Sequence, residues 1–397
     1  MVIHFSLATD CIDASLWCQI IPLWGDGARG VIAIGFIAGD GRIGTMHSAN
    51  LPSDIAARSG HVPGPHLLLG MGHRRKCLYR GGSLYDACTG ELLHQSYVCS
   101  EKIEPDEYRV TLDTPRGQVR IWEDEQALWL QADGQRQCLS RSPVKLPRFD
   151  PHPHAPLLRA LHAQLLVNIM PCGPVPNLWV YPRPWYRDSA MVMMCLEKTG
   201  NLALLEPWVM GLYKVFDQNN NGECEADNPG QLLYMVSLVS DRKHPVVEKV
   251  LREIKRFEKD GYILGRSDFA EHPVYQTKWM KYGLRSLGLD DPYRIPPIAD
   301  SYDHLFWMDY REMYTPSPRF DAERSQLYPY LRWAEAHFFN EPAPATPSSG
   351  DPLLTWEGAA SEADYWRMNL LCDEFTARHW CTPHTWHAAE MFLYYMQ

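Results

Sequence analysis

Three carboxylic acid side chains stand close together near the middle of the chain, where they could divide the work of proton transfer. Glu223, Glu225 and Asp227 fall within five residues, directly before a segment predicted to be helical. Ionised carboxylates this close repel one another and partial burial adds to the cost, so we expect the pKa of one of them to rise. A raised pKa keeps a carboxyl group protonated near neutral pH, as a general acid requires. The sequence predicts an acid catalyst among the three without indicating which one.

The same segment has two alternative interpretations. Its spacing matches most of an EF-hand calcium loop between two predicted helices, with oxygen ligands on Asp217, Asn219, Asn221 and Glu225. The twelfth position is Asn228 rather than the bidentate glutamate, which weakens the case for Ca²⁺. Asn228 followed by a proline and by Gln231 is also an ordinary way to begin a helix. We favour the catalytic interpretation and expect no cofactor, with Ca²⁺ as the weaker alternative.

An arginine and an aspartate flanked by aromatic rings precede another predicted helix. Trp185, Tyr186, Arg187 and Asp188 follow one another in the sequence. Arginine donates hydrogen bonds to a hydroxyl-rich ligand, aspartate accepts them, and the rings exclude water. The plainer alternative is that Asp188 only caps the helix, which is worth about 1 kcal/mol, and that Trp185 only fills the core. We favour substrate binding by all four residues.

A second carboxylate, which could act as a base opposite the acid, is assigned to Glu357. It follows a loop rich in Pro, Ser and Gly at residues 341–352, and loops of this kind commonly carry functional residues. Trp356 beside it could stack on a substrate. Glu362 and Asp364 are the competing carboxylates, which fit equally well as solvated helix residues.

Polar residues at other predicted helix starts complete the candidate site. Asp300 and Asp303 precede a predicted helix and would either bind sugar hydroxyls or cap that helix. His384 and His387 lie three apart at the last predicted helix, with a glutamate three further along, which is a possible metal face. We favour substrate-facing histidines, with Trp386 beside them, and predict no zinc site.

The first third of the chain is predicted to be an antiparallel β-sandwich. Residues 30–39 form one β-rich run, and residues 118–130 show alternating apolar and polar residues on both sides of an acidic turn, which is typical of a hairpin. No long stretch of helical period occurs there. We therefore expect residues 1–141 to form a β-sandwich domain.

A proline-rich segment separates this part from a helical one. Residues 142–156 hold five prolines and are predicted to be a linker, because proline interrupts helices and central strands. Apolar residues then recur with a period of 3.6 through residues 157–397, where paired helices closing on themselves would bury the apolar stripes. After the first helix at 157–169, helices are expected at 189–198, 202–216, 231–240, 246–257, 274–287, 304–311, 326–339, 360–375 and 385–396.

Two of these segments resemble a known clan of enzymes. Residues 185–190, Trp-Tyr-Arg-Asp-Ser-Ala, resemble the Trp-x-Arg-Asp-x-Ala segment of glycoside hydrolases of the glucoamylase, debranching-enzyme and trehalase type, and residues 382–393 are similar to their last inner helix. The resemblance implies an (α/α)6 toroid barrel behind a β-sandwich, with the acid in the middle of the barrel, the base near its end, and Asp188 binding sugar. It also implies inversion, for which the two carboxyl groups stand about 6.5–9.5 Å apart.

Composition and charge argue against several other classes of function. The chain has 397 residues and a net charge of −10, so it lacks the basic surface that nucleic acid binding needs. Its longest apolar run is too short to span a membrane, and its first residues do not resemble a signal peptide. Eleven cysteines without paired spacing fit free thiols in a reducing compartment, so we expect a cytoplasmic protein. No nucleotide-binding motif occurs.

The sequence thus favours a cytoplasmic glycoside hydrolase that cleaves an oligosaccharide or a small glycoside with two carboxyl groups. Its high aromatic content, 12% with 14 Trp and 20 Tyr, suits a sugar-binding cleft. One alternative is a sugar isomerase or epimerase on the same helical barrel, with His384 and His387 as acid and base. The other is a carbohydrate-binding protein that has lost its chemistry.

Overall fold

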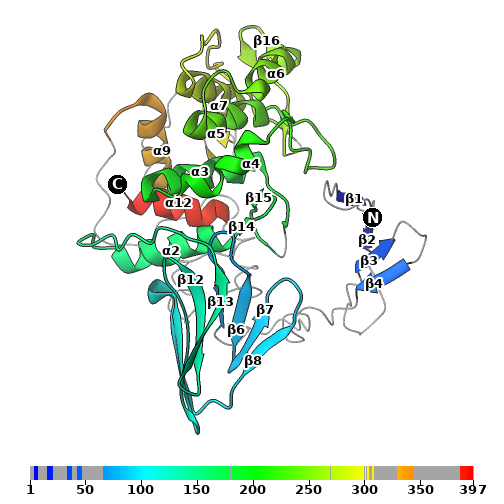
Figure 1. Ribbon diagram of the computed structural model, residues 1–397. Coiled ribbons are helices and arrows are strands. Elements are labelled where there is room, and N and C mark those ends of the chain that lie inside the picture. The colour runs from blue at the N-terminus through cyan, green and yellow to red at the C-terminus, as the bar shows by residue number, and fades with distance from the viewer. Residues whose placement is uncertain are drawn as a thin grey trace, which may run out of the picture.

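Antiparallel sheets come first along the chain and helices follow, as the computed structural model of the protein shows (Figure 1). Before residue 66 the structure describes four strands; beyond it, residues 66–178, 181–268, 270–298, 300, 302–303, 306–307, 329–342 and 385–396 are described. This order confirms the predicted succession of β structure and then α structure.

The four strands near the N-terminus form one antiparallel sheet in sequence order. They are β1 (His4–Leu7), β2 (Leu16–Ile20), β3 (Ile34–Ile37) and β4 (Ile43–Met46). The third of them lies within the apolar run 30–39, which confirms the strand predicted there.

Two larger antiparallel sheets follow. The first contains β5 (His66–Leu69), β6 (Cys77–Arg80), β7 (Ser83–Asp86) and β8 (Leu92–Gln95). The second contains β9 (Ser100–Glu104), β10 (Arg109–Thr114), β11 (Gly117–Glu123), β12 (Ala127–Ala132) and β13 (Gln135–Arg141). The predicted hairpin at 118–130 is confirmed, because β11 pairs with β12 and places Ile121 opposite Leu130.

Apolar side chains from both large sheets pack into one cluster. Alternate residues of a strand point to the same face, so one face of each strand carries the apolar set. Leu69 and Tyr79 from the first sheet contact residues such as Val110, Ile121 and Leu130 from the second, and all five are buried. The alternation that predicted the hairpin therefore also selects the face that is buried.

The helices follow from residue 155 onward. They are α2 (Ala155–Val167), α3 (Tyr186–Thr199), α4 (Glu206–Met210), α5 (Asn228–Val239), α6 (Pro245–Glu253), α7 (Pro273–Ser286), α9 (Pro329–Phe339) and α12 (Thr385–Tyr395). Short two-residue strands link some of them, as in the hairpin of β18 (Arg266–Ser267) and β19 (Ala270–Glu271). None of these helices has the length and apolar composition needed to cross a membrane.

Two of the predicted helices are wrong in their extent or type. Residues 202–216 form only a 3₁₀ turn (Leu202–Leu204) and the five-residue α4, because Pro207 starts a new helix and the chain leaves it at Gly211. Within the predicted helix 304–311, the described residues form part of a small hairpin of β20 (Tyr302–Asp303) and β21 (Phe306–Trp307). The predicted helix 360–375 lies outside the described residues.

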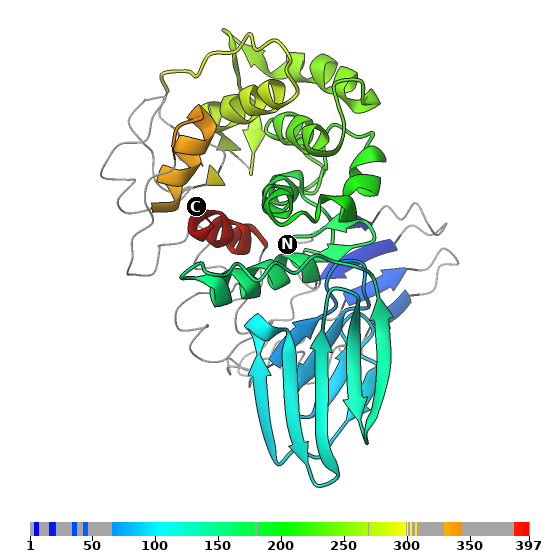
Figure 2. The same ribbon diagram turned by 60° about the vertical axis from the view of Figure 1, so that its left-hand side comes forward.

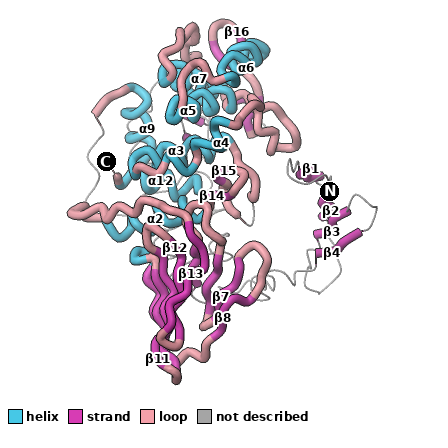
Figure 3. The backbone as a smooth tube through the Cα atoms, viewed as in Figure 1, coloured by secondary structure: helices cyan, strands magenta, loops and turns pink. Residues whose placement is uncertain are grey.

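The helices are arranged around an arc, with the last one beside the first (Figure 2). Helix α12 packs against α2, α3 and α9, while α3 packs against α5 and α5 against α7. In Figure 3 these helices occupy one end of the molecule and the two large sheets the other. Some helices that are neighbours in space are thus far apart in the sequence. In particular, α12, near the C-terminal end of the chain, lies beside α2, at the start of the helical part.

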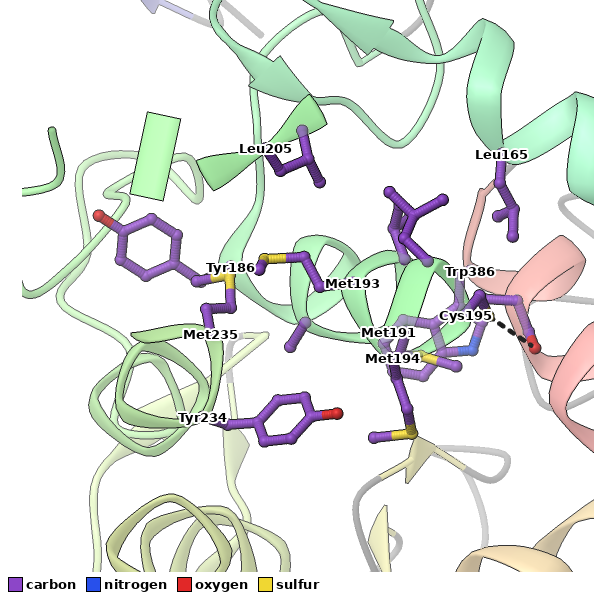
Figure 4. Packing of buried hydrophobic residues seen from close by; sticks show 14 of the residues in the cluster. Leu165, Tyr186, Met191, Met193, Met194, Cys195, Leu205, Tyr234, Met235 and Trp386 are labelled. Carbon is purple, nitrogen blue, oxygen red and sulfur yellow. Dashed lines mark hydrogen bonds between the residues drawn. The ribbon is translucent and has the colours of Figure 1, made fainter. Parts of the chain in front are cut away.

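One apolar core joins these helices. Figure 4 shows Leu165 of α2, Met191 and Cys195 of α3 and Trp386 of α12 packed together, with the Cys195 thiol 3.8 Å from the carbonyl oxygen of Ala389. The same cluster includes Leu68 and Leu78 from strands of the first large sheet, and Met71 and Tyr108 from connections between strands. The sheets and helices therefore share buried surface.

The predicted linker 142–156 is packed against the helical part. Up to the start of α2 at Ala155 it contains no helix or strand, as the prolines predicted. The Lys145 backbone N–H donates to Asn201 Oδ1 at 2.8 Å, and Asn201 Nδ2 donates back to the Lys145 carbonyl at 2.9 Å. Arg159 also donates to the Arg148 carbonyl at 3.1 Å. These bonds fix the path of the segment.

Candidate functional site

Two loops that begin helices meet at the candidate site. The Tyr186 backbone N–H, at the start of α3, donates to Asp217 Oδ2 at 2.8 Å. The Asp217 backbone N–H donates to Asn228 Oδ1, at the start of α5, at 3.1 Å. Asn219 Nδ2 donates to the Pro184 carbonyl at 2.6 Å. The segment 217–227, called the acid loop below, is thereby held against the N-terminal end of α3.

A buried arginine joins two of the three predicted acid candidates. Arg187 Nε lies 3.0 Å from Asp227 Oδ2, and Arg187 Nη2 lies 3.2 Å from Glu225 Oε1. All three side chains are at most 2% exposed. Charges buried this deeply are stable only when they are paired, which explains why the two carboxyl groups gather on one guanidinium.

Asp227 is held by donors from four elements. Besides Arg187, its Oδ2 accepts from Gln231 Nε2 of α5 at 2.8 Å and from the Tyr275 hydroxyl of α7 at 3.3 Å. Its Oδ1 accepts from Ser267 Oγ of β18 at 2.7 Å. Both oxygens are thus occupied by hydrogen bonds that favour the ionised form.

Glu225 is held through one oxygen only. Its Oε1 accepts from Arg187, from Asn220 Nδ2 at 3.4 Å and from the Asp268 backbone N–H. Within the described part of the chain, its Oε2 is buried and has no hydrogen-bond partner. An ionised Glu225 would leave a buried, charged oxygen without a donor, which is energetically costly. A protonated Glu225 can carry its O–H on that oxygen, where it is available as a donor.

The surroundings drive the two carboxyl groups to opposite ionisation states. Burial raises the pKa of Glu225 to about 7; Arg187 opposes this rise and the negative charge of Asp227 adds to it. For Asp227 burial also favours the neutral form, but Arg187 and the bonds from Ser267 and Gln231 prevail and lower its pKa. A neutral acid beside an ionised carboxylate is the pattern expected of acid–base machinery.

Glu223, the third candidate, lies apart from this pair. Its carboxylate forms an ion pair with Arg266 at 3.1 Å, with 31% of the Glu223 side chain and 54% of the Arg266 side chain exposed. A solvated pair of this kind does not reproduce the environment of Glu225, so the structure separates the candidates that the sequence left equivalent.

The aromatic and charged residues at the start of α3 take different positions from one another. Arg187 points to the two carboxylates, whereas it was predicted to donate to a sugar oxygen. Tyr186 is buried and its hydroxyl donates to the Lys214 carbonyl at 2.9 Å. Burial raises the pKa of Asp188 to about 7, against the effect of Arg187. Trp185 is half-buried, with its ring centre 6.0 Å from the Arg187 guanidinium carbon.

Asp300 serves as a cap for α7. Its Oδ2 accepts from the Val274 and Tyr275 backbone N–H groups at 2.9 and 3.3 Å, and its Oδ1 lies 2.9 Å from His272 Nδ1. The sequence offered capping as one of two roles, but for a helix at 304–311. The helix that Asp300 caps instead begins earlier in the chain, since the fold returns residue 300 to the start of α7.

The remaining predicted site residues are only partly described. Trp386 is 1% exposed and packs in the core of the helices. Glu357, Trp356 and His384 lie outside the described residues, as does the side chain of His387. The spacing between Glu225 and Glu357 therefore stays a prediction.

The side chains of the proposed calcium loop bond to the protein itself. Asp217 accepts from two backbone N–H groups, those of Tyr186 and Asn219, and the Asn219 amide reaches Pro184. Glu225 faces Arg187, a cation that opposes the binding of a metal ion. Among the described residues, no group of three or more His, Cys, Asp or Glu is positioned to hold a metal.

Five residues of the network were not predicted as site residues from the sequence: Asn220, Gln231, Ser267, Asp268 and Tyr275. Gln231 lies four positions after Asp227, a spacing that brings side chains together on a helix, so a signal was present but was interpreted as a helix start. Ser267, Asp268 and Tyr275 come from segments about 40 residues further along. No local pattern marks them, because only the tertiary fold brings them to the acid loop.

Comparisons with known proteins give no relative for this chain. A scan against protein-family models, a search of curated proteins and a search of solved structures each find no match. A function for this chain is therefore proposed from the geometry of the site alone.

Proposed function

We propose that this chain is a glycoside hydrolase in which Glu225 is the general acid. The observation that supports this most strongly is the division between Glu225, with a pKa raised to about 7 and one unpaired buried oxygen, and the ionised Asp227 on the same arginine. Cleaving a glycosidic bond requires a protonated carboxyl group that gives its proton to the leaving oxygen.

In this mechanism Glu225 holds its proton on Oε2 and donates it to the glycosidic oxygen, which requires the site to open, because Oε2 is buried in the structure. Oε1 stays fixed by Arg187, Asn220 and the Asp268 N–H, so the carboxyl group keeps its orientation. Asp227 and Arg187 act as positioning residues, and the charge of Asp227 helps to keep Glu225 protonated. Glu357 is the proposed base that activates water, with inversion at the anomeric carbon.

The architecture we propose is a β-sandwich at 1–141, a linker at 142–156 and an (α/α)6 toroid at 157–397. The shared apolar cluster of the two large sheets supports a sandwich. The contact of α12 with α2 and α3 supports a ring of helices that closes on itself. Helix starts in such a ring gather at one end, where Trp185, Arg187 and the acid loop lie together.

The experiment compares the variants Glu225→Gln and Glu223→Gln on a panel of aryl glycosides and oligosaccharides. Removing a general acid lowers kcat by about 10²–10⁴-fold. Glu223→Gln is the matched control and should retain nearly full activity, because it removes only a solvated ion pair. The loss in Glu225→Gln should be smaller for substrates with acidic phenol leaving groups, since these need less help from a proton.

The same assay separates the competing functions. Proton NMR of the first product gives the anomeric configuration and so tests inversion. An unchanged rate in Glu225→Gln would overturn the assignment of the acid. Rearranged sugar without bond cleavage would favour an isomerase or epimerase, and tight sugar binding without turnover would favour a binding protein.

A further inference from the structure

An exposed aromatic ring continues the candidate site toward solvent. Tyr181 is 41% exposed. Its ring centre lies 6.1 Å from that of the half-buried Trp185, with the two planes at 80°. Trp185 in turn lies 6.0 Å from the Arg187 guanidinium. The rings thus lead outward from the arginine that holds Glu225.

The segment that carries these rings is fixed in place. Prolines stand at 182 and 184, on either side of Arg183, and restrict the backbone between the two aromatic residues. The Tyr181 N–H donates to the Asn177 carbonyl at 2.9 Å, and the Pro184 carbonyl accepts from Asn219 of the acid loop at 2.6 Å. The backbone between Tyr181 and Trp185 is therefore held in place, and it is tied to the loop that carries the acid.

The steep angle between the rings of Tyr181 and Trp185 gives a sugar two apolar surfaces to pack against. The apolar face of a pyranose can stack on such a ring, and the order of the segment removes much of the entropic cost of binding. A general acid stands beside the oxygen that leaves. Aromatic rings adjoining the Glu225 side of the site are thus suited to the sugar unit that carries this oxygen.

We propose that Tyr181, with Trp185, binds the leaving-group sugar, so that the substrate class is an oligosaccharide of pyranose units and not a small glycoside. This inference rests on the proposed function and specifies the substrate of that same site. It assigns Tyr181 as a specificity-determining residue, whose ring contributes only when a second sugar unit is present.

The test uses the full chain and the variants Tyr181→Ala, Tyr181→Phe and, as a matched control, Tyr97→Ala, which removes another exposed tyrosine (79%) from the loop between β8 and β9. Substrates are glycosyl fluorides, whose leaving group has no ring, and the matching di- and trisaccharides of glucose, mannose and galactose. Tyr181→Ala should lower kcat/KM about tenfold for the oligosaccharides and leave it unchanged for the glycosyl fluoride. Tyr181→Phe, which keeps the ring, and Tyr97→Ala should behave as wild type.

Calorimetric titration of the same trisaccharides keeps this inference separate from the proposed function. Binding that Tyr181→Ala weakens, without any hydrolysis, would support the sugar surface and overturn the hydrolase. Hydrolysis with equal effects of Tyr181→Ala on short and long substrates would support the hydrolase and overturn the role of Tyr181. Neither binding nor hydrolysis of any of these sugars would overturn both.

Discussion

The protonation of Glu225 sets the pH range in which the proposed acid can act. Burial raises its pKa to about 7, so the carboxyl group carries a proton below that pH and loses it above. We expect kcat/KM to fall as the pH rises through about 7. Asp227→Asn removes a negative charge that raises the pKa of Glu225, while Arg187 remains, so the fall should move to lower pH by about one unit.

Initial rates between pH 4 and 9 for wild type and Asp227→Asn check this prediction, with circular dichroism as the control for folding. A role of Asp227 confined to stability would lower the rate at every pH and leave the midpoint of the fall in place. A midpoint that moves upward in Asp227→Asn would contradict the electrostatic coupling of the two carboxyl groups.

Ser267 provides a second test among single residues, this time of stability. Its hydroxyl donates to Asp227 Oδ1 at 2.7 Å and the side chain is fully buried. Ser267→Ala leaves a buried charged acceptor short of a donor, so the free energy of unfolding should fall by about 1.5–3 kcal/mol. The control Ser237→Ala, in which the lost bond runs to the neutral Tyr234 carbonyl, should cost less. Urea denaturation measures both, and equal losses would contradict the argument.

The residue pattern singled out three acids, of which Glu225 and Asp227 lie together, but it did not predict that Arg187 pairs with them. Mutual repulsion follows from three carboxyl groups in five residues, so a raised pKa could be predicted from the sequence, but for Glu225 burial is the larger cause. Arg187 and Asp188 were predicted to face one ligand together. Adjacent residues on a helix point about 100° apart, so side chains at i and i+1 do not share a face. Arg187 turns to Glu225 and Asp227, residues that local sequence could not connect to it.

Among the elements, α5 and α7 owe their close approach to two glycines. A Cβ on Gly230 of α5 would lie 2.3 Å from the Trp279 carbonyl carbon, and one on Gly283 of α7 would lie 2.4 Å from the Gly230 oxygen. The helix backbones touch here with no room for a methyl group. Because α5 carries Gln231 and α7 carries Tyr275, this contact also positions two donors to Asp227.

Gly230→Ala should therefore destabilise the protein, by about 1–3 kcal/mol, although alanine has the higher helix propensity. Gly211, at the end of α4, is the matched control, since it lacks the positive φ that disfavours alanine and its added Cβ would meet atoms only at 3.5 Å. Gly211→Ala should be neutral or slightly stabilising. Thermal unfolding of both variants measures these changes in stability. A Gly230→Ala variant as stable as the wild type would show that α5 and α7 can move apart.

The elements that could be predicted from the sequence are those whose pattern lies within a short stretch of residues. The hairpin at 118–130 and most helices follow from alternation or the 3.6 period, and these predictions are confirmed. The helix expected at 202–216 failed because its apolar residues fit the period while Pro207 and Gly211 interrupt it. The contact of α12 with α2 joins residues more than 200 positions apart, so periodicity alone contained no signal for it.

For the molecule as a whole, a buried ion pair ties the sheets to the helices. Glu123 of β11 accepts from the Gly70 and Met71 N–H groups, each at 2.9 Å, and pairs with Arg74 at 3.0 Å, with both side chains fully buried. The Gly72 N–H then donates to the Leu166 carbonyl of α2 at 2.8 Å. The loop between β5 and β6 thus links the second large sheet with the first helix, next to the core that sheets and helices share.

Because the two parts share a core, they should unfold together. Glu123→Gln leaves Arg74 buried without its counter-charge and should lower the free energy of unfolding by about 3–5 kcal/mol. Glu91→Gln, which removes an exposed partner of Arg75, should cost about 1 kcal/mol or less. Hydrogen exchange at increasing urea should show peptides of β10–β12 and of α5 and α7 losing protection at the same concentration, shifted downward together in Glu123→Gln. If that variant releases the sheets while α5 and α7 remain protected, the shared core does not couple them, and each part folds on its own.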